Sequence, residues 1–228
     1  MIEFVFLDLD DTILDFHRAE HEALKETLVH FGIEPEEMVL SRYSVINKEH
    51  WERLERREIT RDQVRVDRFA ALFTELGISA EAADIARNYE SNLSHKYFFM
   101  PGAERTLNAL EGKYRLFLAS NGNSHVQRGR LTGADLYRRF EDVFVSQDIG
   151  YDKPSPDYFN ACFGRIPGFD PAKALMVGDS LTSDILGGIN AGIRTCWVNS
   201  RGKPGRPDIR PDYEIGSIGA LPALLQKM

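Results

Sequence analysis

Short apolar runs, separated by stretches with helical periodicity, dominate the hydrophobic pattern of the chain. Five runs have the composition of buried parallel strands, at residues 4–9, 114–119, 143–145, 174–177 and 194–198. Helical patterns lie between them, for example over 103–110 and 183–191. Strands that alternate with helices predict an open, mostly parallel α/β sheet.

The segment 16–97 interrupts this alternation, because it contains no convincing strand. Apolar residues recur there at helical spacing, and Gly32 and Gly77 are predicted helix stops. We therefore predict an α/β core made of residues 1–15 and 98–228, with a four-helix cap inserted at 16–97. The stretch 201–211, rich in Pro, Gly and Arg, is predicted to be a surface loop.

Polar residues follow each apolar run. In parallel α/β sheets, ligands bind beyond the carboxyl ends of the strands. We therefore expect one edge of the sheet to gather the residues that follow the five runs, namely Asp8, Ser120, Ser146, Asp179 and Asn199.

The strongest chemical signal is the sequence Asp8-Leu9-Asp10-Asp11-Thr12 at the end of the first run. Side chains at i and i+2 of a strand share a face, so Asp8 and Asp10 are expected to point to the same place. Two adjacent carboxylates repel, which favours a bound cation, and Mg²⁺ is the usual choice beside phosphate. The alternative is a helix cap or an acidic surface turn.

A second acidic motif, from Gly178 to Asp184, follows the fourth run and opens a helix. Asp179 is expected beside Asp8 if their strands are neighbours, and Gly178 lets backbone approach a ligand closely. Asp184 lies at the helix start, where a carboxylate also serves as a cap.

Two further segments supply groups that suit a phosphate. Lys153, just before Pro154, offers an ammonium group that can touch both a phosphate and Asp8. The alternative for Lys153 is a solvated loop lysine. Ser120 and Asn121 offer a hydroxyl and backbone N–H groups at a strand end.

Composition and charge exclude several other classes of protein. The 228 residues are 43% hydrophobic and 28% charged, which is typical of a soluble enzyme. The net charge of −7 provides no basic field for nucleic acid or for an anionic membrane. Cys162 and Cys196 form no metal motif or disulfide framework. The first residues resemble neither a signal peptide nor a membrane span, so we expect a cytoplasmic protein.

Taken together, these motifs resemble the haloacid dehalogenase (HAD) superfamily. Their order matches its pattern of DxDx[TV], then Ser or Thr, then Lys, then GDxxxxD. The resemblance implies a Rossmann-like sheet of order 3-2-1-4-5 with an inserted helical cap. It implies a Mg²⁺-dependent phosphatase that acts on a small phosphomonoester.

The resemblance also assigns roles to single residues. Asp8 resembles the nucleophile that forms an aspartyl-phosphate, and Asp10 resembles the general acid and base. The metal ligands would be Asp8, Asp179 and the backbone carbonyl of Asp10, with Asp184 orienting metal-bound water or Lys153. Phosphate-binding groups would come from Ser120, Asn121 and Lys153.

Within the superfamily, residues 178–199 resemble the bacterial noncanonical pyrimidine 5′-nucleotidases. Asn47, Lys48 and Trp51 in the cap match that group as well, and they are candidate substrate contacts. The sequence departs from the group at Ser120, at 123–125 and at 53–61, which concerns nucleotide preference rather than chemistry. Trp51 has the alternative role of filling the cap interior.

Four other functions share these motifs or this fold. The main alternative is a broad phosphatase of sugar phosphates or phosphoglycolate. A mutase similar to β-phosphoglucomutase keeps the same nucleophile, and a haloacid dehalogenase uses it on carbon without needing Mg²⁺ or Asp10. A non-catalytic binding module is the fourth, although every expected catalytic position is filled.

Overall fold

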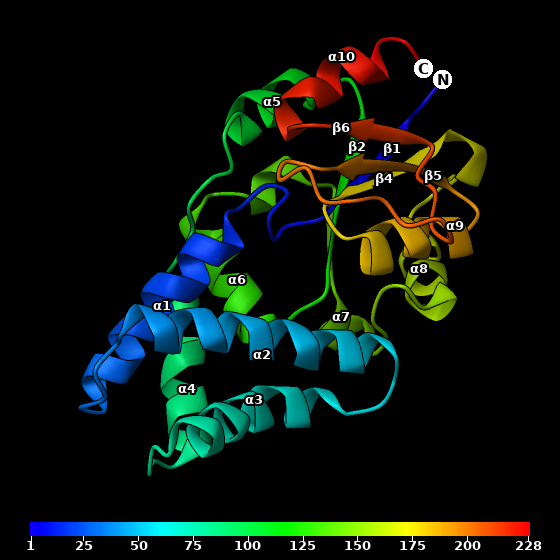
Figure 1. Ribbon diagram of the computed structural model, residues 1–228. Helices are drawn as coiled ribbons and strands as arrows, with labels where there is room; N and C mark the ends of the chain where they lie inside the picture. Colours follow the sequence, from blue (N-terminus) through cyan, green and yellow to red (C-terminus); the bar gives the residue numbers. More distant parts are fainter. The chain divides into compact units, whose positions relative to one another are not determined.

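The computed structural model describes residues 1–228 as two compact units. The core unit comprises Met1–Asp15 and Phe98–Met228, and the helical unit comprises Phe16–Tyr97. Strands occur in the core unit, whereas the helical unit is built from four helices (Figure 1). None of the helices combines the length and the apolar composition that crossing a lipid bilayer requires.

A six-stranded parallel sheet forms the centre of the core unit. Its order is β3-β2-β1-β4-β5-β6, so the predicted Rossmann-like class and the order 3-2-1-4-5 are confirmed, with a sixth strand added at one edge. The central strand β1 pairs with β2 and β4, and Leu7 lies opposite Leu118 and Val177. The strands are β1 (Phe4–Leu7), β2 (Arg115–Ser120), β3 (Asp142–Val145), β4 (Ala174–Gly178), β5 (Arg194–Val198) and β6 (Tyr213–Ile215).

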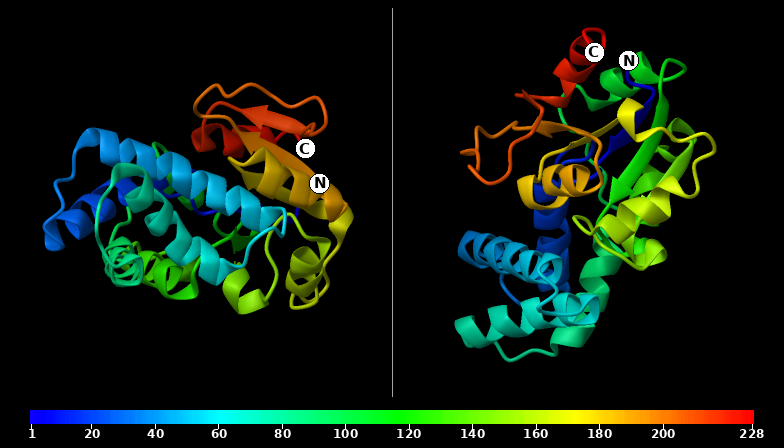
Figure 2. Two further views of the ribbon diagram at one scale, coloured as in Figure 1. Left: turned by 60° about the horizontal axis from the view of Figure 1, so that its bottom comes forward. Right: turned by 90° about the vertical axis from the view of Figure 1, so that its right-hand side faces the viewer.

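Helices cover both faces of this sheet, which explains why its strands read as continuous apolar runs. Val5 and Leu7 belong to a buried cluster with residues of α5 and α10, whereas Phe4 and Phe6 pack with residues of α8. Figures 1 and 2 show α5 and α10 on one side of the sheet, α8 and α9 on the other, and the two termini close together. The α-helices of the core unit are α5 (Ala103–Leu110), α6 (Ser124–Gly133), α7 (Ser146–Ile149), α8 (Pro156–Phe163), α9 (Leu186–Asn190) and α10 (Leu221–Leu225).

Four helical segments that are not α-helices complete the core unit. A π-helix, Leu181–Ile185, runs directly into α9, so the single helix expected over 183–191 begins with a wider turn. The 3-10 helices are Tyr137–Arg139, Pro171–Lys173 and Ile218–Ala220.

The helical unit packs α1 against α4 and α2 against α3. Both predicted stops are present, since Gly32 (φ 71°) follows α1 and Gly77 caps α3 in the left-handed conformation. A capping box between Thr60 and Gln63 starts α3. The helices are α1 (Phe16–His30), α2 (Glu37–Glu55), α3 (Arg61–Leu76) and α4 (Ala82–Leu93).

Candidate active site

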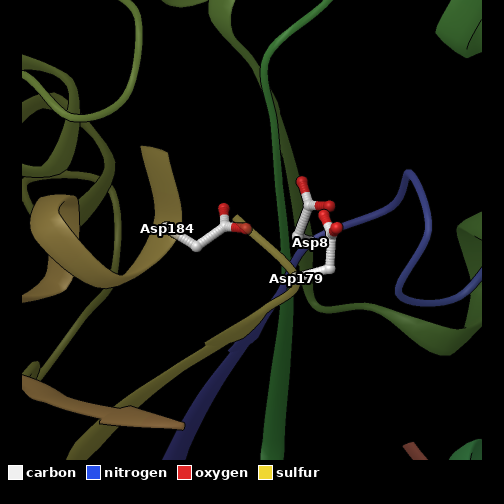
Figure 3. Close-up of side chains that lie close together, drawn as sticks. All are labelled: Asp8, Asp179 and Asp184. Atoms are coloured by element: carbon white, nitrogen blue, oxygen red, sulfur yellow. The ribbon is translucent and has the colours of Figure 1, made fainter. Parts of the chain in front are cut away.

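Three carboxylates gather at the carboxyl ends of β1 and β4. Asp8 follows β1, Asp179 follows β4, and Asp184 comes from the π-helix that begins two residues later. One oxygen from each lies within 4.8 Å of the others. Figure 3 shows the side chains of Asp8 and Asp179 close together, with Asp184 reaching toward them from its helix.

Lys153 supplies the positive charge in this cluster. Its Nζ donates to Asp8 Oδ1 at 2.7 Å, to Asp184 Oδ1 at 2.6 Å and to the carbonyl oxygen of Ala119 at 2.6 Å. The side chain is 1% exposed, so all three of its N–H groups are satisfied by protein atoms in a buried position. Lys153 is therefore part of the site and is not the solvated loop lysine of the alternative interpretation.

Asn121 holds the segment that carries Lys153. Its Oδ1 accepts from the Lys153 backbone N–H at 2.9 Å, and its Nδ2 donates to the Lys153 carbonyl oxygen at 2.9 Å. The same Nδ2 also lies 3.2 Å from Ser183 Oγ. These bonds connect the end of β2 to the loop before α8 and to the π-helix. The side chain of Asn121 thus supports Lys153, in addition to the phosphate-binding role predicted for its N–H group.

The carboxylate of Asp10 is not a member of the three-carboxylate cluster, although its charge contributes to the raised pKa of Asp8. The strand ends at Leu7 instead of continuing to Leu9, and Asp11 turns the chain with φ 57°, so the expected i, i+2 geometry does not apply. The Asp10 carboxylate accepts hydrogen bonds from Gln127 and Arg130 of α6 instead. Its predicted contribution to metal binding, through the backbone carbonyl, stays a prediction.

Burial and crowding shift the ionisation of these groups. Burial, together with the negative charge of Asp184, raises the pKa of Asp8 well above its usual range. Burial raises the pKa of Asp179 to about 6, although Lys203 acts in the opposite direction. For Lys153, burial alone would lower the pKa, but the charges of Asp184 and Asp8 outweigh it and raise the pKa. The positive charges of Lys153 and Lys203 thus do not fully offset the negative charges of these carboxylates.

A hard divalent cation fits this donor set. Asp8, Asp179 and Asp184 offer only carboxylate oxygens, which Mg²⁺ prefers, and their mutual repulsion falls when a cation binds. Both oxygens of Asp184 are already engaged, by Lys153 Nζ and by the Ser180 N–H at 3.0 Å. This suits Asp184 to orienting Lys153, which is one of the two roles that the resemblance implies, and leaves Asp8 and Asp179 as the better direct ligands.

Three residues near the site escaped sequence analysis. Gln127 and Arg130 are buried polar residues of α6, and Lys203 Nζ lies 2.9 Å from Asp179 Oδ2. Lys203 belongs to the predicted surface loop, where Asn199 holds it by accepting a hydrogen bond from its backbone N–H at 2.7 Å.

Gln127 and Arg130 had a signal in the sequence, because their spacing with the apolar Val126 and Leu131 is that of a buried helix face.

The candidate substrate residues of the helical unit differ in their surroundings. Asn47 is buried, where it donates to Glu20 Oε1 at 2.6 Å and accepts from Arg68 Nη1 at 2.7 Å. Lys48 is exposed and lies 3.8 Å from Glu52. Trp51 is half-buried and packs against the cluster of Leu54, Ile59 and Val64.

The remaining residues that follow strands have local partners. Ser120 is fully buried, and its Oγ accepts from Gln127 Nε2 at 2.9 Å. Ser146 Oγ accepts from the Gly122 N–H at 3.1 Å.

Gly178 provides a direct test of how tightly this site is packed. A Cβ at this position would lie 2.1 Å from Asp184 Oδ2, so alanine must push Asp184 away from Lys153. We expect Gly178→Ala to lower the free energy of unfolding by about 1–3 kcal/mol in urea denaturation. The control is Gly205→Ala, where a Cβ meets nothing within 4 Å and where we expect a change below about 0.5 kcal/mol. Equal stability of the two variants would contradict the packing described here.

Comparison with known proteins agrees with this geometry. Residues 2–192 match the family model described as haloacid dehalogenase-like hydrolase. The chain is 40% identical over 217 residues to HAD-hydrolase YfnB of Bacillus subtilis, covering 95% of this chain and 92% of that protein. It is 35% identical over 226 residues to the pyrimidine 5′-nucleotidase PynA of Streptococcus pneumoniae, covering 99% of this chain and 95% of that protein.

A solved structure supports the same relationship. The crystal structure of YfnB from Bacillus subtilis, bound to magnesium, superposes with a TM-score of 0.94 at 39% identity and covers 98% of both chains. Both the family match and the YfnB similarity extend over most of the chain. The chain therefore belongs to the haloacid dehalogenase-like hydrolases.

Proposed function

We propose that this chain is a Mg²⁺-dependent phosphomonoester hydrolase that forms an aspartyl-phosphate on Asp8. The observation that carries the proposal is the contact of Asp8 with the buried Lys153, beside two further carboxylates that suit a divalent cation. Such a site gathers a nucleophile, a fixed cation and oxygen ligands where a phosphoryl group needs them. The magnesium in the YfnB structure is consistent with it.

The proposed reaction uses the protein's own groups in two steps. In the first, an oxygen of Asp8 attacks phosphorus while Asp10 gives its proton to the leaving oxygen, which departs as an alcohol. In the second, Asp10 takes a proton from water, the water oxygen attacks phosphorus, and inorganic phosphate leaves with Asp8 regenerated. The positive charge of Lys153 and the predicted phosphate-binding groups of Ser120 and Asn121 stabilise the charge of the phosphoryl group. When bound, Mg²⁺ supplies positive charge that offsets the carboxylates and the phosphoryl group.

The crowding of carboxylates argues against the dehalogenase alternative. A 2-haloacid carries its own carboxylate, which the excess negative charge of Asp8, Asp179 and Asp184 would repel when no cation is bound. Dehalogenation also has no need of an acid at the position of Asp10.

For the substrate, we propose nucleoside 5′-monophosphates, with pyrimidine deoxynucleotides such as dUMP or dTMP preferred. The name of PynA and the match of Asn47, Lys48 and Trp51 to the nucleotidase pattern support this choice. The core groups named above would bind the phosphate and the metal, which every phosphomonoester substrate shares. Selection among leaving groups therefore needs other residues, and the helical unit supplies the candidates. Lys48 is exposed and Trp51 is half-exposed, whereas the buried Asn47 supports α2 from inside the helical unit.

Replacing Asp8 by Asn tests the nucleophile. An amide cannot form the acyl phosphate, so we expect kcat on 4-nitrophenyl phosphate to fall at least about 10³-fold while the circular dichroism spectrum is unchanged. Asp208→Asn, on an exposed side chain paired with Arg206, is the control and is expected to keep wild-type activity. A folded Asp8→Asn protein within tenfold of the wild-type rate would contradict the assignment.

Removal of divalent cations tests the metal. We expect excess chelator to abolish hydrolysis and added Mg²⁺ to restore it, because the carboxylates otherwise repel the phosphoryl group. Asp179→Asn is expected to raise the Mg²⁺ concentration needed for half-maximal activity at least about tenfold. Full phosphatase activity in chelator would rule out the proposal and would make a 2-haloacid the next substrate to test.

A panel of phosphorylated metabolites tests the substrate. Stacking of a base on an aromatic ring contributes about 1–3 kcal/mol, so we expect Trp51→Ala to lower kcat/KM for dUMP roughly 5- to 150-fold. The same variant should leave 4-nitrophenyl phosphate nearly unaffected, and Trp51→Phe should retain most nucleotide activity. Equal losses on both substrates would show that Trp51 only packs against its neighbours in the helical unit. Phosphoglycolate or a hexose phosphate that surpasses every nucleotide tenfold would favour the broad phosphatase.

A further inference from the structure

Two side chains of α6 donate hydrogen bonds to the carboxylate of Asp10, one to each oxygen. Gln127 Nε2 donates to Asp10 Oδ2 at 2.8 Å, and Arg130 Nη1 donates to Asp10 Oδ1. Because residues three apart lie on one face of a helix, a single surface of α6 presents both donors. Arg130 has no solvent exposure, whereas the Asp10 side chain is 25% exposed. The Arg130 donor is therefore buried, whereas part of the Asp10 side chain is exposed to solvent.

The same two side chains also fix each other. Gln127 Oε1 accepts from Arg130 Nη1 at 2.9 Å, which determines which end of the Gln127 amide faces Asp10. The Gln127 Nε2 group donates as well to Ser120 Oγ at 2.9 Å. Gln127 thus connects the general acid and base to a residue predicted to bind phosphate.

Gly122 leaves the space that this arrangement needs. A Cβ at Gly122 would lie 2.8 Å from Gln127 Nε2 and 2.9 Å from its Cγ. The Gly122 backbone does not occupy the left-handed region, so alanine would be tolerated there but for Gln127. A methyl group at this position is a way to move Gln127 without removing it.

We propose that Gln127 and Arg130 are positioning residues that set the direction of the Asp10 carboxylate for proton transfer. The inference rests on the proposed function, because it assumes that Asp10 protonates the leaving group and then activates water. Proton transfer requires a carboxylate oxygen within hydrogen-bond reach of the reacting oxygen, and a carboxylate free to rotate meets that requirement less often. Loss of the donors should therefore lower kcat/KM most for those substrates whose leaving groups depend most on protonation.

The test uses three aryl phosphates of similar shape, namely 4-nitrophenyl, phenyl and 4-methoxyphenyl phosphate. The 4-nitrophenolate leaves readily without a proton, whereas the other two leaving groups are progressively more basic. We expect Arg130→Met and Gln127→Met to lower kcat/KM for 4-methoxyphenyl phosphate by about 10- to 100-fold. The loss on 4-nitrophenyl phosphate should stay below about threefold, and Arg130→Lys should recover part of the lost activity, because Lys keeps one charged donor.

The second step provides an independent readout. If water activation slows while Asp8 is still phosphorylated, the variants should release a burst of 4-nitrophenolate before the steady state. Gly122→Ala should show the same leaving-group dependence as Gln127→Met. It therefore tests the positioning role of Gln127 even if Arg130→Met does not fold. Arg128→Met is the control, since Arg128 lies on the same helix but is exposed and pairs with Asp148 at 3.1 Å.

Equal losses across the three substrates, with no burst, would overturn the inference and leave Gln127 and Arg130 a structural role only. Unchanged activity in the variants would overturn it as well. A wild-type protein that hydrolyses neither these three substrates nor dUMP contradicts the proposed function itself, and the inference with it. The two failures are therefore distinguishable before any variant is made.

Discussion

The burial of the Lys153 ammonium group is the constraint on which the rest of the site depends. A buried cation is costly unless its charge and all its hydrogen bonds are matched, and here Asp8, Asp184 and the Ala119 carbonyl oxygen do so. These partners belong to three different parts of the core unit: the end of β1, the π-helix after β4, and β2. Loss of any one of these acceptors leaves one N–H group of the buried ammonium without a hydrogen-bond partner. The need to pair one ammonium group therefore fixes the relative positions of segments far apart in the sequence.

The same constraint leaves the site with an excess of negative charge. Lys153 offsets one carboxylate of the Asp8, Asp179 and Asp184 cluster, and Lys203 contributes a second cation on the Asp179 side. An ion-pair network whose role is structural would be expected to balance its charges. A site that binds a divalent cation and a phosphoryl group need not balance its own charges, because both ligands carry charge.

This charge imbalance is the physical basis of the proposed hydrolase, and the hydrogen bonds of Asp10 to α6 are consistent with it. The carboxylate proposed to transfer protons has hydrogen-bond partners of its own, distinct from those of the carboxylates that suit the cation.

Much of this architecture follows from the sequence, for identifiable reasons. Strands buried on both faces are continuous apolar runs, and the residues that follow them, such as Asp8 and Asp179, mark the binding edge of the sheet. The sixth strand was not predicted, because Tyr213–Ile215 is three residues long and has no apolar run. The contacts of Asp10 with α6 were not predicted, because β1 stops at Leu7, two residues earlier than its apolar run, and strand periodicity says nothing beyond that point. Lys203 lies in a loop whose path depends on the Asn199 contacts rather than on any periodic pattern.

The central claim is that the phosphoryl group passes through Asp8, and chemical trapping tests it most directly. An aspartyl-phosphate is an acyl phosphate, which borohydride reduces to homoserine, whereas a free aspartate resists it. The protein would be mixed with 4-nitrophenyl phosphate and Mg²⁺, quenched rapidly, treated with borohydride and digested for peptide mass spectrometry. The account predicts homoserine at position 8, only when substrate and Mg²⁺ are both present. Turnover without any modification of Asp8, or with homoserine at Asp10 or Asp179 instead, would contradict it.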